Sequence, residues 1–368
     1  MTARRSATWP WALGATLALG VAGAWASGCS TPSSELDGGD LRGVFDRTTS
    51  TGAGAPSGSS RDGGAPRPKT RPSASASASA EPEPTVVPLR RPPVPGPCID
   101  PHGEPAGKPD HFVGRPACRG ARILEWKDPD GAPRYACVYA ADDAANRAPL
   151  PAVLFFHAEW DKPSAVGDRT KLRRRLGSFA LSDDPRHAGF VVVAVQARRA
   201  EGWDVGYTAR DNPDAVAADH FLGLLEAEGL VDVRRVYALG DARGGVMAAL
   251  YAALRPDRIA AFAAFGADAT RIGWTCAAPE PPAMALYRAC DSVVACDAVE
   301  SWVDLRRRRG ALTRALRLGP SKSEEPYCVP RAQCGENQGK ANHARWPDLR
   351  EEDVLEFFAR YSLESRAP

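Results

Sequence analysis

The chain contains a glycine-flanked turn whose shape suits nucleophilic catalysis. Residues 236–239 form an apolar run that predicts a buried strand, and residues 246–254 predict a helix. The sequence GDARG at 240–244 lies between them. In the pattern G-x-S-x-G, a turn of this kind presents a serine at a strained apex, and the flanking glycines let the neighbouring backbone pack closely. The apex residue here is Ala242, so we expect the turn to lack its attacking hydroxyl.

The rest of the chain predicts the elements that would position such a turn. A hairpin is expected at 121–140, and its turn reads DPDG. Strands are predicted at 151–157, 189–195, 259–265, 283–287 and 312–318, and helices at 168–180, 213–228, 299–309 and 351–361. Asp211 and Asn212 are both candidate caps for the second of these helices. Strands that alternate with helices predict a mostly parallel sheet covered on both faces, in one domain at 98–368.

The first quarter of the sequence predicts export rather than a folded core. Two arginines, an apolar segment at 11–25 and the string ASGC at 26–29 are typical of a signal peptide over 1–28. The cysteine of that string, Cys29, looks like the lipidated residue of a bacterial lipobox, and cleavage of an ordinary signal peptide near Ala26 or Gly28 is the alternative. Residues 29–97 are rich in Ser, Pro, Gly and Ala and predict a disordered linker. We therefore expect a protein of the cell envelope that is anchored to the membrane through Cys29, or otherwise a secreted one.

The remaining cysteines and the net charge narrow the function classes. An even number of cysteines in an exported chain predicts up to four disulfides, with Cys290/Cys296 and Cys328/Cys334 as local candidates. The eight candidates are Cys98, Cys118, Cys137, Cys276, Cys290, Cys296, Cys328 and Cys334. None of them has the close spacing of a zinc site, so no metal is expected. A net charge of +2 gives no indication of nucleic-acid binding.

Three strings in order resemble a known superfamily. They are RRVYALGDARGG at 234–245, RACDSVV at 288–294 and ANHARWP at 341–347. Together with the order of elements over about 120–365, they resemble the α/β-hydrolase superfamily, and within it the polyhydroxyalkanoate depolymerases and feruloyl-esterase-like proteins. The resemblance implies an α/β-hydrolase fold: a mostly parallel, twisted sheet with helices on both faces.

The resemblance also implies the partners of the missing nucleophile. A serine needs a base to accept its proton, and the base needs an acid that fixes its tautomer. By the matching strings, His343 is that base and Asp291 that acid, retained either as relics or to act on water directly. The alternatives are a packing or surface histidine and a turn residue.

The oxyanion hole is also expected to differ from that of the family. The family usually has His-Gly after its third strand, whereas here Ala158 and Glu159 follow His157. Backbone N–H groups of Ala158 or Glu159, and of Arg243, the residue after the apex, remain candidate donors. Glu159 would bring a negative charge close to the place where an oxyanion forms. Asp241 is a second carboxylate beside the turn, but the glycine spacing puts residue 242 rather than Asp241 at the apex.

These features predict a non-catalytic, esterase-like binding protein without a cofactor. Loss of the nucleophile leaves only about 10³–10⁴-fold residual catalysis over water in a serine hydrolase. The expected ligand is a small molecule, an ester or a glycan in a cleft above Ala242, with tryptophans as candidate lining residues. These are Trp160, Trp203, Trp274 and Trp346. The alternatives are an active esterase with an unrecognised nucleophile or with water activated by His343 and Asp291, and an envelope scaffold.

Overall fold

The structure, a computed structural model, describes residues 96–109, 112–182, 187–319 and 324–363. The predicted signal peptide, the lipidation candidate Cys29 and the linker up to residue 95 lie outside these residues. The predictions made for them therefore stay predictions.

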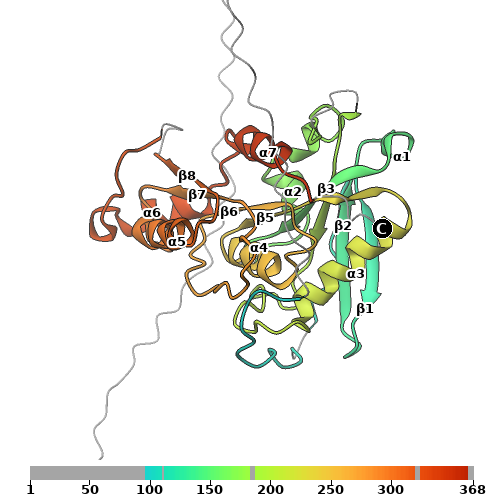
Figure 1. Cartoon of the computed structure of the whole chain (residues 1–368), viewed down its shortest axis with the longest axis horizontal. Helices are drawn as coiled ribbons and strands as arrows, with labels where there is room; N and C mark the ends of the chain where they lie inside the picture. The colour runs from blue at the N-terminus through green and yellow to red at the C-terminus, as the bar shows by residue number, and fades with distance from the viewer. Residues whose placement is uncertain (1–95, 110–111, 183–186, 320–323, 364–368) are drawn as a thin grey trace, which may run out of the picture. The chain divides into compact units, whose positions relative to one another are not determined.

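A sheet of eight strands forms the centre of the described part of the chain, in the order β1-β2-β4-β3-β5-β6-β7-β8 (Figure 1). Strand β2 pairs antiparallel with β1 and with β4, and the pairs from β4 to β8 are parallel. The mostly parallel sheet and the opening hairpin are confirmed. The strands are β1 (Arg122–Lys127), β2 (Pro133–Tyr139), β3 (Leu150–Phe156), β4 (Val191–Val195), β5 (Val231–Asp241), β6 (Ala261–Phe265), β7 (Ala283–Arg288) and β8 (Thr313–Leu318).

Helices cover both faces of this sheet, which explains the continuous apolar runs of its middle strands. Every residue of β3, β4 and β6 is buried, because side chains on both faces of a strand meet a helical layer. Residues of α3, α4 and α5 pack with one face, and residues of α2 and α7 with the other (Figure 1). The helices are α1 (Ala144–Arg147), α2 (Ala165–Asp168), α3 (Pro213–Ala227), α4 (Arg243–Leu254), α5 (Cys296–Arg308), α6 (Glu336–Ala344) and α7 (Glu351–Ala359).

The start of α3 shows how the local sequence sets a helix boundary. Asn212 is the N-cap, and its Oδ1 accepts hydrogen bonds from the N–H groups of Asp214 and Ala215 at 3.0 and 3.1 Å. Proline at the first helical position needs no such partner, which suits Pro213 to that place. Of the two candidate caps, Asn212 therefore holds the helix.

One predicted helix is wrong and one helix was missed. The helix expected at 168–180 is only the short α2 followed by a 3₁₀ turn at Leu172–Arg174, because its basic residues face solvent and leave no continuous apolar stripe. Helix α6, which carries His343, was not expected. Its sequence, ENQGKANHA, is polar and contains a glycine, so it has no periodic apolar signal.

Four disulfides form among the eight predicted cysteines, but the local pairs are wrong. The bonds join Cys98 to Cys276, Cys118 to Cys137, Cys290 to Cys334, and Cys296 to Cys328. Cys290 and Cys296 are close in sequence, yet each bonds a cysteine of the segment after β8. Pairing follows the spatial neighbours of the folded loops rather than sequence separation.

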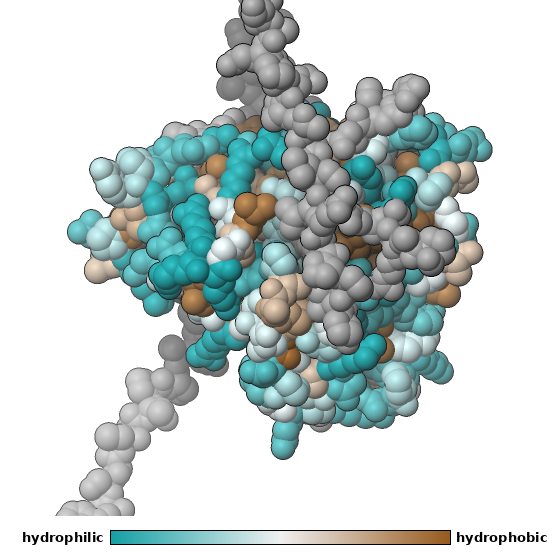
Figure 2. All heavy atoms as spheres, in the orientation of Figure 1, coloured by the Kyte–Doolittle hydropathy of each residue, from teal (hydrophilic) through white to brown (hydrophobic). Residues whose placement is uncertain are grey.

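Hydrophilic residues predominate on the face of the described part seen in Figure 2, and hydrophobic ones are scattered over it in small patches. Large exposed apolar side chains come from separate segments, for example Leu224, Val233, Leu312 and Tyr327. Across the residues that the structure describes, no helix combines the length and apolar character needed to cross a membrane.

Candidate active site at the elbow

The turn predicted from the glycine spacing is present and joins β5 to α4. Ala242 is at its apex with φ 50° and ψ −117°, a conformation that an L-residue adopts only under strain. Its N–H donates to the Phe265 carbonyl at 2.8 Å, and its carbonyl accepts from the Gly245 N–H at 2.9 Å. The apex is therefore fixed from both sides, in the conformation of a nucleophile elbow.

Close backbone packing explains the glycines around the apex. A Cβ atom on Gly240 would lie 2.0 Å from the Gly244 carbonyl oxygen. One on Gly244 would lie 2.1 Å from the Phe156 carbonyl oxygen, at the end of β3. Both distances are far below a van der Waals contact, so only glycine allows the elbow to sit against β3.

The predicted acid and base are in direct contact. His343 Nδ1 and Asp291 Oδ2 are 2.8 Å apart, and both side chains are buried. Asp291 Oδ1 accepts hydrogen bonds from the N–H groups of Val293 and Val294 at 2.8 and 2.9 Å. A carboxylate held in this way accepts the Nδ1 proton, so the lone pair of the neutral imidazole is on Nε2. Nε2 has no hydrogen-bond partner among the described residues.

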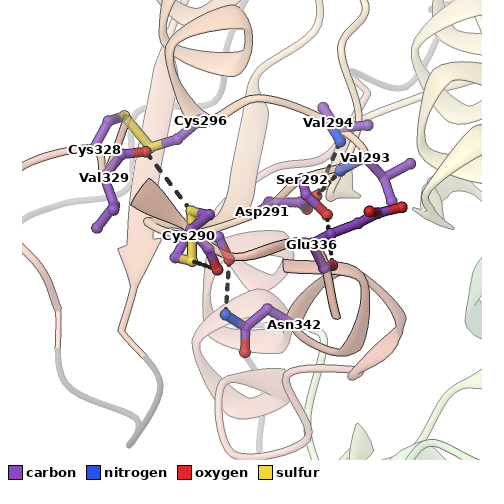
Figure 3. The surroundings of a disulfide bond; sticks show 11 residues. Cys290, Asp291, Ser292, Val293, Val294, Cys296, Cys328, Val329, Glu336 and Asn342 are labelled. Carbon is purple, nitrogen blue, oxygen red and sulfur yellow. Dashed lines mark hydrogen bonds between the residues drawn. A yellow bond between two sulfur atoms is a disulfide. The ribbon is translucent and has the colours of Figure 1, made fainter. Parts of the chain in front are cut away.

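Contacts around the Cys290–Cys334 disulfide hold the Asp291 loop, which follows β7, against helix α6, which carries His343 (Figure 3). The Cys290–Cys334 disulfide joins the residue before Asp291 to the segment that leads into α6. On α6, Asn342 Nδ2 donates to the Cys290 carbonyl at 2.8 Å, one residue before His343. A Cβ atom on Gly339 would lie 2.5 Å from the Ser292 Cβ, so the glycine lets α6 approach the acid loop.

A cavity of about 650 Å³ opens above the elbow and is lined by both Ala242 and His343. Asp291 and Asp241 are not among the residues that line it. Its walls mix apolar and charged side chains. The other lining residues are His102, Glu159, Val205, Gly206, Arg243, Val246, Gly266, Ala267, Asp268, Arg271, Ile272 and Val294.

A carboxylate occupies the predicted oxyanion hole. The Arg243 backbone N–H, which follows the apex, donates to Glu159 Oε2 at 3.1 Å. The Arg243 side chain turns aside, where its Nε donates to the Trp203 carbonyl at 2.8 Å. The donor that would stabilise an oxyanion in a serine hydrolase is thus already bound to a negative side chain of the same chain.

The second predicted donor, Ala158, does not line the cavity. Its carbonyl accepts from His157 Nδ1 at 2.7 Å, while His157 Nε2 accepts from the Ala197 N–H at 3.2 Å. Burial lowers the pKa of His157, so its ring is neutral and has a structural role. Of the residues after His157, Glu159 and not Ala158 lines the cavity.

The carboxylates around His343 favour its charged form. Burial opposes a charge on the ring, but the hydrogen bond and charge of Asp291 outweigh it, with further contributions from Glu159 and Asp241. The pKa of His343 is consequently raised above its ordinary value. This environment therefore stabilises the imidazolium form of His343 relative to the neutral ring.

Arg169 links the elbow to its surroundings, a role that the sequence did not reveal. Its guanidinium lies 3.1 Å from Asp241 Oδ2 and 2.6 Å from Asp161 Oδ2, and it donates to the Ala344 carbonyl at the end of α6. Burial of Asp241 raises the pKa of that carboxyl to about 7, against the opposing charges of Arg169 and His343. Arg169 stands in a run of basic residues, where nothing in the pattern distinguishes it from a solvated side chain.

The prediction that four tryptophans line the cleft is wrong, since none of them borders the cavity above Ala242. Trp203 and Trp346 are buried in the core, and Trp274 packs partly buried against it. Trp160 is exposed and borders a different cavity. Core packing is the common fate of tryptophan, and their spacing in the sequence gave no information on direction.

No family model and no curated protein sequence matches the chain. Among solved structures, it is similar to a thermostable esterase at 18% identity and a TM-score of 0.46, over 67% of this chain and 64% of that one. It is also similar to esterase 2 of Thermogutta terrifontis, at 16% identity and a TM-score of 0.44, over 66% of this chain and 93% of that one. A third similar structure is an esterase of Pyrobaculum calidifontis, at 20% identity and a TM-score of 0.42, over 65% of this chain and 84% of that one. The alignment thus spans less than two thirds of the first of these esterases.

The chain has the α/β-hydrolase fold. Its mostly parallel eight-stranded sheet, the helices on both faces and the elbow after β5 carry this assignment, and the fold class predicted from sequence is confirmed. At identities of 20% and below, the roles of residues in those esterases do not transfer to this chain.

Proposed function

We propose that the chain is an exported α/β-hydrolase-fold protein that binds a small ligand in the cavity above Ala242 and does not perform the serine-hydrolase reaction. One observation carries the proposal: the apex of an otherwise assembled elbow, acid and base is an alanine. A methyl group cannot attack a carbonyl carbon, and no other nucleophilic hydroxyl or thiol lines the cavity among the described residues.

Glu159 adds independent support. An oxyanion about 4 Å from its carboxylate would be destabilised by roughly 4 kcal/mol at an effective dielectric constant of about 20. That is the opposite of what the Arg243 N–H does in an active hydrolase, where one such donor contributes about 10²–10³ in rate. The chain therefore lacks both the nucleophile and an oxyanion donor that is free of negative charge, which is more than the loss of a single side chain.

The lining of the cavity suggests the class of ligand. Val205, Val246, Ile272 and Val294 offer an apolar wall, which suits the body of a small organic molecule such as an ester. Arg271 and Asp268 supply polar contacts at the same cavity, and a glycan is the second ligand class that we consider.

Export and anchoring belong to the same proposal. Four disulfides suit an oxidising compartment, and they support a signal peptide over 1–28 with a lipid anchor at Cys29 and a linker over 29–97. The resemblance to the depolymerase and feruloyl-esterase-like branch suggests descent from a secreted esterase. A scaffold without a cleft ligand gains no support from the open cavity.

The test compares esterase activity of the exported protein and its variants on short-chain p-nitrophenyl esters. We expect no enzyme-like turnover from the wild type and a small gain from Ala242→Ser. Adding Glu159→Gln to Ala242→Ser should raise turnover by a further ~10²-fold, because the oxyanion donor is relieved of a charge. Adding His343→Ala instead should remove the gain.

Enzyme-like turnover by the wild type that His343→Ala abolishes would overturn the proposal and favour the alternative, a water-attacking esterase. His343 lines the cavity, and its Nε2 has no hydrogen-bond partner among the described residues; this observation keeps the alternative in view. The Glu159 carboxylate on the Arg243 N–H speaks against it, because it places a negative charge where the oxyanion of an ester reaction would form.

A further inference from the structure

A second cavity, of about 630 Å³, lies apart from the one above Ala242, and the two share no lining residue. The loop after β3 separates them, since Glu159 borders the elbow cavity and the next residue, Trp160, borders the second one. The segment before β1, the end of β2 and the residues around α2 complete its walls. The function proposed above makes no use of this cavity.

Cations to which the described residues offer no ion pair line this second cavity. Arg119, Lys162 and Arg173 are exposed there, and no ion pair of theirs is found among the described residues. Two further charged residues line the cavity, and each forms an ion pair: Arg115 with Glu125, and Asp161 with Arg169. Asp168 is then the one lining carboxylate left to oppose three cations, so the cavity is positively charged.

A buried amide in the same cavity lacks its partner. Gln196 is 4% exposed and lines the cavity, and its Oε1 has no hydrogen-bond partner within the described part of the chain. Its Nε2 has a single long contact, 3.4 Å to the Gly114 carbonyl. A buried polar group without a partner costs free energy, which a polar ligand would recover by hydrogen bonding to it.

An aromatic surface stands at this cavity. Trp160 is 71% exposed, and its backbone has a positive φ of 60°. The backbone there is fixed, because the Trp160 N–H donates to the Ala200 carbonyl at 3.1 Å. An exposed indole on a strained but hydrogen-bonded backbone offers a flat apolar face to a ligand, while its neighbours supply charge.

We propose that this cavity binds an acidic saccharide. A sugar ring stacks its C–H face on the Trp160 indole, the carboxylate of a uronic acid meets Lys162 and Arg119, and a hydroxyl group bonds to the Gln196 amide. Stacking, cations and a neutral amide together recognise this class, whereas a simple anion would use the cations alone and a neutral sugar would leave them without a partner.

The experiment titrates the full-length protein with a trimer of galacturonic acid and with a neutral trimer of galactose, using calorimetry and tryptophan fluorescence. We expect saturable binding of the acidic trimer that weakens with added salt, and at least about tenfold weaker binding of the neutral one. Trp160→Asn, chosen because asparagine tolerates a positive φ, should remove the fluorescence change and weaken binding about tenfold. Arg119→Gln/Lys162→Gln should remove the preference for the acidic trimer.

Lys171→Gln is the control outside the cavity: it removes one half-buried cation, which pairs with Asp348, and should leave the dissociation constant unchanged. The double charge variant changes exposed residues alone, so it tests the proposal even if Trp160→Asn folds poorly. No saturable binding up to about 10 mM trimer would overturn the proposal. Equal affinity for both trimers, or binding that Lys171→Gln weakens as much as the cavity variants do, would overturn it as well.

Discussion

The Glu159 carboxylate accepts the hydrogen bond of the Arg243 backbone N–H, at 3.1 Å from Oε2. This N–H immediately follows the elbow apex, so the chain places its own negative charge where a hydrolase places that of a reaction intermediate. The same carboxylate is among the groups that raise the pKa of His343. One side chain therefore changes both the oxyanion hole and the base.

We predict that Glu159→Gln lowers the pKa of His343, because it removes one of the negative charges that favour the imidazolium. Glutamine keeps an oxygen acceptor for the Arg243 N–H, so the loop geometry should persist. Asp291→Asn should lower the pKa more, since Asp291 makes the larger contribution. Titration of the histidine ring proton by NMR measures these values. Asp268→Asn removes another carboxylate of the cavity and should change the pKa of His343 little. An equal decrease of this pKa in Asp268→Asn, or no decrease in Glu159→Gln, would contradict the prediction.

A second prediction concerns pH and the free energy of unfolding. Asp241 is 3% exposed and has a folded pKa of about 7, while an unfolded aspartate titrates near ~3.9. Between these values the folded state binds more protons than the unfolded state, so stability falls as pH rises through this window, by at most about 1.4 kcal/mol per pH unit. The raised pKa of His343 acts in the same direction above ~6.5.

Asp241→Asn should therefore flatten the decline of stability between about pH 5 and 7, measured by urea unfolding at a series of pH values. Asp142→Asn, at an exposed turn, controls for the loss of one negative charge and should keep the wild-type slope. An unchanged slope in Asp241→Asn would show that the folded carboxyl titrates lower than stated.

A third prediction uses two glycines. Gly244→Ala should destabilise the protein by more than about 3 kcal/mol or prevent folding, because its Cβ would meet two backbone carbonyls of the β3 end. Gly223→Ala is the matched exchange in the interior of α3, where a Cβ has open space, and should stabilise by about 0.5–1 kcal/mol. Thermal and urea unfolding measure both. Similar effects of the two exchanges would refute the steric explanation of the elbow glycine.

Local patterns predicted those parts of the molecule that local physics determines. The elbow followed from two glycines at fixed spacing, and the buried strands followed from continuous apolar runs. The contact between Asp291 and His343 was expected from the resemblance of their surrounding strings. The structure brings the two side chains together, while their catalytic role stays untested.

Features that depend on how distant loops meet were beyond the sequence. Disulfide pairing followed the neighbours of the folded chain, and the local pair Cys290/Cys296 was wrong for that reason. Helix α6 depends on its packing against the acid loop, where Gly339 fits against Ser292, rather than on apolar periodicity. The charge expected from Glu159 was anticipated, but its hydrogen bond to the elbow was not.

The strained apex has a consequence for the history of the chain. Backbone in the conformation of Ala242 costs of order 1–3 kcal/mol, which is a sizeable share of the ~5–15 kcal/mol by which domains are stable. In an active hydrolase this strained turn presents a nucleophile to the substrate. Under the function proposed above, it presents a methyl group that takes no part in a reaction. Its persistence is then an inheritance, held in place by the hydrogen bonds of the Ala242 backbone with Phe265 and Gly245.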